Sequence, residues 1–178
     1  MKSTKRALIA YVIIAGLVIL LDQFSKLFIQ ISLAPGATWT PWEWLAPYAR
    51  IVHWYNTGVA FGMFQNGNTV FAVLSGLIAV AIIVYAPKVI TGHWLTTLSM
   101  GMVLGGAIGN LIDRLILGHV IDFVSVGTFP VFNVADSGIT VGVAIFLLDM
   151  IIQEQKLKKL AVVTTIEPLP GSEQEDEA

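Results

Sequence analysis

The 178-residue sequence contains no cysteine, and only 12% of its residues are charged. The first absence excludes disulfide bonds, thiolate nucleophiles and thiolate metal ligands. The second excludes an ordinary soluble domain, in which about 25% of the residues are charged and help to cover the surface. Hydrophobic residues make up 56% of the chain, and the mean hydropathy is +0.78. Because a bilayer solvates apolar faces, this composition indicates a membrane protein.

Four apolar segments of the chain are long enough to cross a membrane as helices. A helix needs about 20 mostly apolar residues to span about 30 Å of hydrocarbon. The predicted spans are residues 7–29, 69–86, 95–112 and 135–152. Together they define one domain over residues 1–163. Residues 164–178 are rich in acidic residues and proline, cannot bury a core, and form a predicted disordered tail.

The lysine and arginine residues predict how the chain crosses the membrane. If both termini lie in the cytoplasm, the cytoplasmic flanks hold seven of these residues and the opposite flanks hold three. Lysine and arginine are enriched on the cytoplasmic side of membrane proteins. We therefore expect both termini, and with them the acidic tail, to be cytoplasmic.

Two segments of the chain then lie on the outer side of the membrane, and both contain short stretches typical of β-strands. Residues 30–68 are rich in tryptophan, have β-prone residues at Ala49–Tyr55 and carry the turn signal Pro35-Gly36. The second segment contains a β-prone stretch from His119 to Val124. The predicted fold is thus an all-α membrane protein with four transmembrane helices and a small β-rich cradle and loop on the outer side.

Carboxylates gather at the outer ends of the predicted spans, where each one costs roughly 2.5–3.5 kcal/mol if it enters the bilayer. Asp22 and Lys26 are four residues apart, so they can pair on one helix face. This pair either neutralises itself or faces a substrate. Asn110, Asp113 and Arg114 also share one helix face, where both a structural role and a site-orienting role are open.

Asp122 and Asp136 are the most informative carboxylates. Singly, each has a structural explanation: Asp122 can be a solvated loop acid, and Asp136 can form a capping box with Asn133 at the start of the fourth helix. The short connection between the third and fourth spans also lets both carboxylates converge at one depth. Two close carboxylates share one proton, so one can act as a base and the other as an acid. Such a pair can activate water against an amide.

The histidine and serine residues do not form a competing catalytic set. His53, His93 and His119 are not at metal-ligand spacing, so we predict neither a metal nor a cofactor. Ser125 could join His119 and Asp122, but no nucleophile elbow surrounds it. The glycines lie within a predicted membrane helix and do not form a phosphate-binding loop.

Four ordered motifs resemble those of the lipoprotein signal peptidases, which are the signal peptidase II enzymes of bacteria and form peptidase family A8. The motifs are NTGVAFG at 56–62, GGAIGNLIDR at 105–114, VIDF at 120–123 and FNVADSGI at 132–139. The pair of Asp22 and Lys26 is similar to one in the family. Val59 stands where alanine is frequent in the family, and the acidic tail lies outside the family pattern.

The resemblance implies an aspartic endopeptidase of the bacterial inner membrane with its site near the periplasmic face. It implies cleavage of diacylglyceryl-modified prolipoproteins just before the lipidated cysteine, and sensitivity to globomycin. The expected partners are the lipid-modified signal peptide and membrane lipids, with no nucleic acid and a monomeric enzyme. The implied catalytic dyad is Asp122 and Asp136. The implied substrate-binding or supporting residues are Asn56, Gly58, Gly106, Asn110, Arg114, Asn133, Asp113, Asp22 and Lys26.

Two functions of other classes are alternatives. A small ion- or proton-coupled transporter would also need carboxylates in the membrane, but it usually places them near the bilayer midplane. An assembly factor could use the glycines of the third span for helix docking. That function leaves Asp122 and Asp136 without a role.

Overall fold

The computed structural model describes residues 2–58, 67–90 and 92–166. The chain divides into two compact units, Met1–Phe146 and Leu147–Ala178, and each is considered by itself. Residues 59–66, which include the second half of the motif at 56–62, lie outside the described residues. The same holds for residues 167–178 of the predicted tail.

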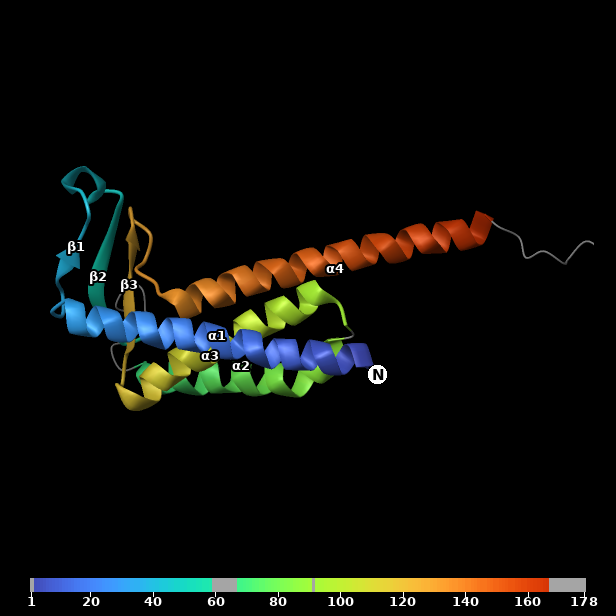
Figure 1. The fold of residues 1–178 in the computed structure, drawn as a ribbon, viewed down its shortest axis with the longest axis horizontal. Helices are drawn as coiled ribbons and strands as arrows, with labels where there is room; N and C mark the ends of the chain where they lie inside the picture. The colour runs from blue at the N-terminus through green and yellow to red at the C-terminus, as the bar shows by residue number, and fades with distance from the viewer. Residues whose placement is uncertain (1, 59–66, 91, 167–178) are drawn as a thin grey trace, which may run out of the picture. The chain divides into compact units, whose positions relative to one another are not determined.

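Four long helices in the described part of the chain confirm the prediction of four membrane helices (Figure 1). Each is long and apolar enough to cross a membrane. The helices are α1 (Lys2–Ser32), α2 (Asn68–Val89), α3 (Trp94–Ile116) and α4 (Val134–Ile166). Helix α4 enters the second unit after Phe146 and ends at Ile166, so the first three residues of the predicted tail are helical.

Helix α3 is the centre of the first unit, because α1 and α2 both pack against it. In its apolar stretch 56% of the residues are buried, compared with 11% in α2. Glycines allow the close approach of α1: a Cβ atom on Gly101 would lie 2.8 Å from Ile14, and one on Gly105 would lie 2.6 Å from Val18. This small-residue packing places the polar end of α1 directly beside α3.

A three-stranded antiparallel sheet follows the end of α1, in the spatial order β1-β2-β3. The strands are β1 (Thr38–Trp39), β2 (Ala49–Asn56) and β3 (Val120–Val126), and a short 3₁₀ helix spans Glu43–Leu45. The predicted strands are therefore confirmed, as is the turn at Gly36, whose φ of 79° suits glycine. A bulge between Ile51 and Trp54 shifts the register, so that Trp54 pairs with Asp122.

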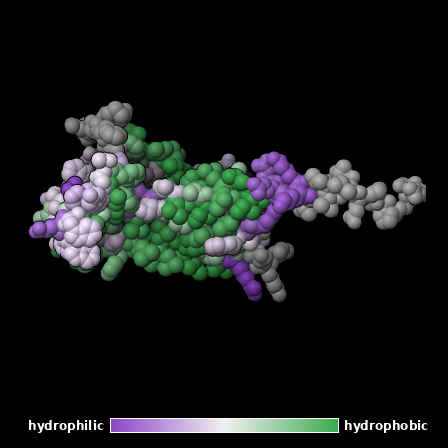
Figure 2. Space-filling model, turned by 90° about the horizontal axis from the view of Figure 1, so that it is seen from above, coloured by the Kyte–Doolittle hydropathy of each residue, from purple (hydrophilic) through white to green (hydrophobic). Residues whose placement is uncertain are grey.

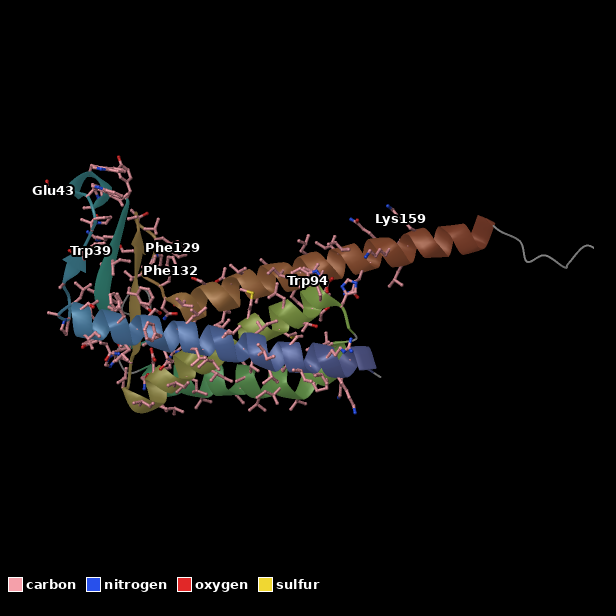
Figure 3. The ribbon with its side chains drawn as sticks, viewed as in Figure 1. Trp39, Glu43, Trp94, Phe129, Phe132 and Lys159 are labelled. Atoms are coloured by element: carbon pink, nitrogen blue, oxygen red, sulfur yellow. The ribbon has the colours of Figure 1, made fainter. Side chains whose placement is uncertain are left out.

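The outer surface of the helices is apolar, as a membrane span requires. Figure 2 shows a broad green surface along the helices and paler residues over the sheet. Trp39 on β1 and Trp94 at the start of α3 lie at opposite ends of the first unit, and both are exposed (Figure 3). Tryptophan at both ends of a helix bundle is typical of the two membrane interfaces.

Candidate active site

Asp122 and Asp136 come from two different elements that meet at the sheet end of the first unit. Asp122 lies in the middle of β3 and is 1% exposed. Its neighbours Ile121 and Phe123 pack with Ile29 of α1. Because side chains alternate along a strand, Asp122 projects from the opposite face of β3. Asp136 lies in the first turn of α4 and is half-buried.

Asp136 caps its own helix, as the sequence predicts. The Asp136 N–H donates to Asn133 Oδ1 at 2.9 Å, and the Asn133 N–H donates to Asp136 Oδ2 at 3.2 Å. This reciprocal capping box uses only one carboxylate oxygen. The other oxygen, Oδ1, accepts a hydrogen bond from Asn110 Nδ2 at 2.7 Å. The capping role is therefore present, and it fixes the carboxylate rather than competing with a role in chemistry.

Two asparagine amides hold the Asp122 carboxylate. Asn56 Nδ2 donates to Oδ2 at 2.8 Å, and Asn133 Nδ2 donates to Oδ1 at 2.7 Å. The backbone N–H of Gly58 donates to Asn56 Oδ1 at 2.9 Å, which turns the amide nitrogen of Asn56 toward Asp122. Asn133 thus contacts both aspartates, through its side-chain nitrogen on Asp122 and its capping box with Asp136.

The environment of Asp122 favours its protonated form. Burial is the main cause and the charge of Asp136 the second, and together they raise the pKa of Asp122 to about 7. The hydrogen bonds from Asn56 and Asn133 and the charge of Lys26 oppose this rise in pKa. Near neutral pH a large share of the molecules therefore carries a proton on Asp122. This is the condition that a paired-carboxylate site requires.

A buried ionic cluster lies beneath the two aspartates, with Lys26 at its centre. The Lys26 ammonium is 2.7 Å from Asp22 Oδ2 and 2.8 Å from Asp113 Oδ2. All three residues are at most 3% exposed. The predicted pairing of Asp22 with Lys26 is confirmed, and Asp113 joins it from α3. A buried cation held by two carboxylates fixes the relation of α1 to α3, since breaking it would leave a charge without a partner.

The two carboxylates of this cluster also fix the backbone beside each aspartate of the pair. Asp22 Oδ1 accepts the N–H of Ala135 at 2.9 Å, one residue before Asp136. Asp113 Oδ2 accepts the N–H of Ile121 at 3.2 Å, one residue before Asp122. The ionic cluster therefore positions both β3 and the first turn of α4.

Asn110 connects the ionic cluster to the aspartate pair. Its Oδ1 accepts hydrogen bonds from Lys26 Nζ and from Asn133 Nδ2, each at 3.1 Å. An amide whose oxygen accepts from two donors must present its nitrogen elsewhere, and here Nδ2 donates to Asp136. The Lys26 ammonium thus sets the orientation of the Asn110 side chain toward Asp136.

Gly106 and Arg114 lie at the edge of this constellation. A Cβ atom on Gly106 would collide with the Ala135 carbonyl oxygen, so glycine lets the first turn of α4 approach α3. Arg114 donates to the Asn110 backbone oxygen at 3.3 Å and to Ser75 Oγ at 3.4 Å. No hydrogen bond from Arg114 to Asp122 or Asp136 is found among the described residues.

Gln23 belongs to the same network, although sequence reasoning did not single it out. Its Nε2 donates to Asp113 Oδ1 at 2.9 Å, and to Asp22 Oδ2 and the Gly109 carbonyl oxygen, each at 3.2 Å. A glutamine within an apolar helix, next to an aspartate, was the available signal. Its amide donates to Asp113 Oδ1, which Lys26 does not contact, and shares Asp22 Oδ2 with the Lys26 ammonium.

The histidines of the described chain have structural contacts. His53 Nδ1 is 2.7 Å from the Leu33 carbonyl oxygen and ties β2 to the end of α1. The His119 ring lies against Tyr55, with 4.1 Å between the ring centroids. Within the described ranges, no three acidic or histidine side chains come close enough together to hold a metal ion.

Comparison with known proteins identifies the family. Residues 14–152 match the family model described as signal peptidase (SPase) II. The chain belongs to the signal peptidase II family. A lipoprotein signal peptidase of Shouchella clausii is 38% identical over 151 residues, which are 83% of this chain and 96% of the relative. One of Synechocystis sp. is 40% identical over 146 residues, 80% of this chain and 87% of the relative.

Solved structures support the same assignment. A bacterial membrane enzyme superposes with a TM-score of 0.74 at 26% identity, covering 82% of this chain and 90% of that one. A second has a TM-score of 0.71 at 27% identity, covering 79% and 91%. Family membership confirms the prediction of a protease with four membrane helices and a small sheet, and it removes the transporter and assembly-factor alternatives.

Replacing Lys26 by methionine tests the ionic cluster. The variant leaves two buried carboxylates without their cation, so we expect a loss of about 3–5 kcal/mol in the free energy of unfolding. Thermal unfolding followed by tryptophan fluorescence in detergent measures it. The matched control is Lys158→Met, because Lys158 pairs with Glu154 at the same distance of 2.7 Å and the same i,i+4 spacing but is exposed. An equal effect of both substitutions would contradict the assigned role.

Proposed function

We propose that this signal peptidase II family member removes signal peptides from diacylglyceryl-modified lipoprotein precursors, with Asp122 and Asp136 as its catalytic dyad. One observation carries the assignment: Asn133 joins two carboxylates that differ in burial, and the pKa of the more buried one is raised to about 7. The names of the relatives support lipoprotein precursors as the substrate class. Cleavage just before the lipidated cysteine remains part of the proposal.

The proposed mechanism divides the chemistry between the two carboxyl groups. Asp136 is the base: two N–H donors and the N-terminus of α4 stabilise its negative charge. It takes a proton from water as the water oxygen bonds to the scissile carbonyl carbon. Asp122 is the acid, and its proton passes to the carbonyl oxygen. When the carbon–nitrogen bond breaks, the leaving nitrogen takes the proton from Asp136 and the carbonyl oxygen returns its proton to Asp122.

The remaining site residues take supporting roles in this proposal. Asn56 and Gly58 face the pair from the end of β2, and we assign them to substrate contact as well as to the orientation of Asp122. Arg114 is half-buried beside Ser75 and is assigned to the substrate backbone. The ionic cluster of Asp22, Lys26 and Asp113 acts through the backbone and through Asn110.

We further propose that the sheet end faces the periplasm and that both termini are cytoplasmic, in the bacterial inner membrane. The lysine and arginine distribution supports this orientation. In the first unit the N-terminus lies at the end opposite the sheet (Figure 1). Both aspartates come from one chain, which supports a functional monomer.

Replacing either aspartate by asparagine tests the dyad. Asparagine keeps the shape and removes the ionisable proton, so we expect Asp122→Asn and Asp136→Asn each to lower turnover by about 10⁴-fold, as loss of a member of a catalytic unit does elsewhere. The assay is cleavage of a diacylglyceryl-modified precursor in detergent. Glu43→Gln is the control, since Glu43 is an exposed carboxylate at the tip of the sheet (Figure 3). Near-normal cleavage by a folded Asp122→Asn or Asp136→Asn protein would remove that residue from the dyad.

The raised pKa of Asp122 predicts how activity depends on pH. The proposed acid must be protonated, so activity should fall above about pH 7 as Asp122 loses its proton. Asn56 stabilises the ionised form of Asp122 and lowers its pKa. Asn56→Ala should therefore raise the pKa and move the alkaline limb of the kcat profile to higher pH, even as kcat falls. A limb that stays in place, or moves to lower pH, would show that Asp122 is not the group that titrates.

A further inference from the structure

An apolar pocket lies at the sheet end of α1, and none of the asparagines that contact Asp122 and Asp136 lines it. It has a volume of about 500 Å³ and lies between the outer end of α1 and the sheet. Its lining residues are Ser25, Phe28, Ile29, Ser32, Leu33, Trp39, Ile51 and Phe123. The four residues Ser25, Phe28, Ile29 and Ser32 recur at helical spacing, so they form one stripe on α1.

This pocket is separate from the catalytic site. Phe123 lines it, and side chains alternate along β3, so the neighbouring Asp122 projects from the opposite face of the strand. Ile29, another lining residue, packs with Ile121 and Phe123.

The lining of the pocket selects a hydrocarbon ligand. Six of its eight residues are apolar, and none is charged. One of the two hydroxyls, Ser25 Oγ, already donates to the Asp22 carbonyl oxygen at 2.8 Å. A peptide or sugar bound there would leave its own polar groups without partners, which is costly in an apolar site. The volume is within the usual range of about 300–1,000 Å³ for small-ligand pockets.

The pocket is continuous with the part of α1 that faces lipid. Phe28 lines the pocket and is 57% exposed, and its neighbours Phe24 and Ile31 are each 74% exposed. Trp39 lies at the rim and is 55% exposed, in the position of an interfacial tryptophan (Figure 3). An acyl chain can therefore enter the pocket sideways without leaving the hydrocarbon layer.

We propose that this pocket binds one acyl chain of a phospholipid from the leaflet on the sheet side of the membrane. The chain lies between α1 and the sheet and packs against Phe123, the residue after Asp122. The occupant is a bulk membrane lipid rather than the acyl chains of a substrate, because the pocket borders the lipid-facing side of α1 and shares no lining residue with the asparagines around the aspartates. This assignment does not depend on the proposed function.

Photo-crosslinking in nanodiscs tests the proposal. The full chain is reconstituted with phosphatidylethanolamine and phosphatidylglycerol, of which a trace carries a diazirine in one acyl chain, and the crosslinked residues are identified by mass spectrometry. We expect crosslinks to concentrate on Phe28, Trp39 and Ile51. Crosslinks spread evenly along the lipid-facing side of α1 would overturn the proposal.

A matched pair of substitutions sharpens the result. Ser32→Trp places an indole at the mouth of the pocket, whereas Ile31→Trp adds the same group to a neighbouring exposed position that does not line it. Each methylene group excluded from an apolar site lowers affinity about fourfold, so excluding about two should reduce crosslinking at Ile51 about 15-fold. Ile31→Trp should leave it unchanged. An equal effect of both substitutions would overturn the proposal.

A competition experiment distinguishes the two sources of acyl chains. Excess unlabelled diacylglyceryl-modified precursor is added to Asp136→Asn protein in the same nanodiscs. Unchanged crosslinking at Ile51 is expected for a phospholipid site. Loss of crosslinking in proportion to precursor occupancy would assign the pocket to the substrate and overturn the proposal made here.

Discussion

The buried ammonium of Lys26 is the interaction on which the rest of the site depends. It is held by Asp22 from its own helix and by Asp113 from α3, and all three side chains are almost fully shielded from solvent. Buried charges are costly unless they are paired and hydrogen-bonded, so this cluster is stable only in one arrangement of α1 and α3. The same two carboxylates hold the backbone directly before Asp122 and Asp136. One electrostatic requirement thus fixes two helices, a strand and the start of a third helix.

The polar groups form two layers with different properties. The inner layer is ionic and lies under the aspartate pair, where its remaining lone pairs are used by Gln23 and by backbone N–H groups. The upper layer consists of asparagine amides, which carry no net charge and present N–H groups to each aspartate. Amides orient the carboxylates without neutralising them. The burial of Asp122 and the nearby charge of Asp136 can therefore keep a proton in the site.

Much of this arrangement could be predicted from the sequence, for identifiable reasons. Helix spans follow from hydropathy, and the pairing of Asp22 with Lys26 and the capping box of Asp136 follow from fixed spacings along one helix. The contacts of Asn110 with Lys26 and Asp136 were not predictable, because they join residues far apart in the chain. The lipid-facing pocket was also invisible, since apolar residues on α1 look alike whether they face lipid, core or a cavity.

The proposed chemistry depends on one shared proton in the aspartate pair, which difference infrared spectroscopy can observe directly. The carbonyl stretch of a protonated carboxyl group is distinct from that of a carboxylate and can be followed as a function of pH in lipid. We predict a protonated-carboxyl band that titrates with a midpoint near pH 7 in the wild-type protein, where burial and Asp136 raise the pKa of Asp122. The band should be absent in Asp122→Asn. A wild-type protein with no such band near neutral pH, or a band that survives in Asp122→Asn, would contradict the account.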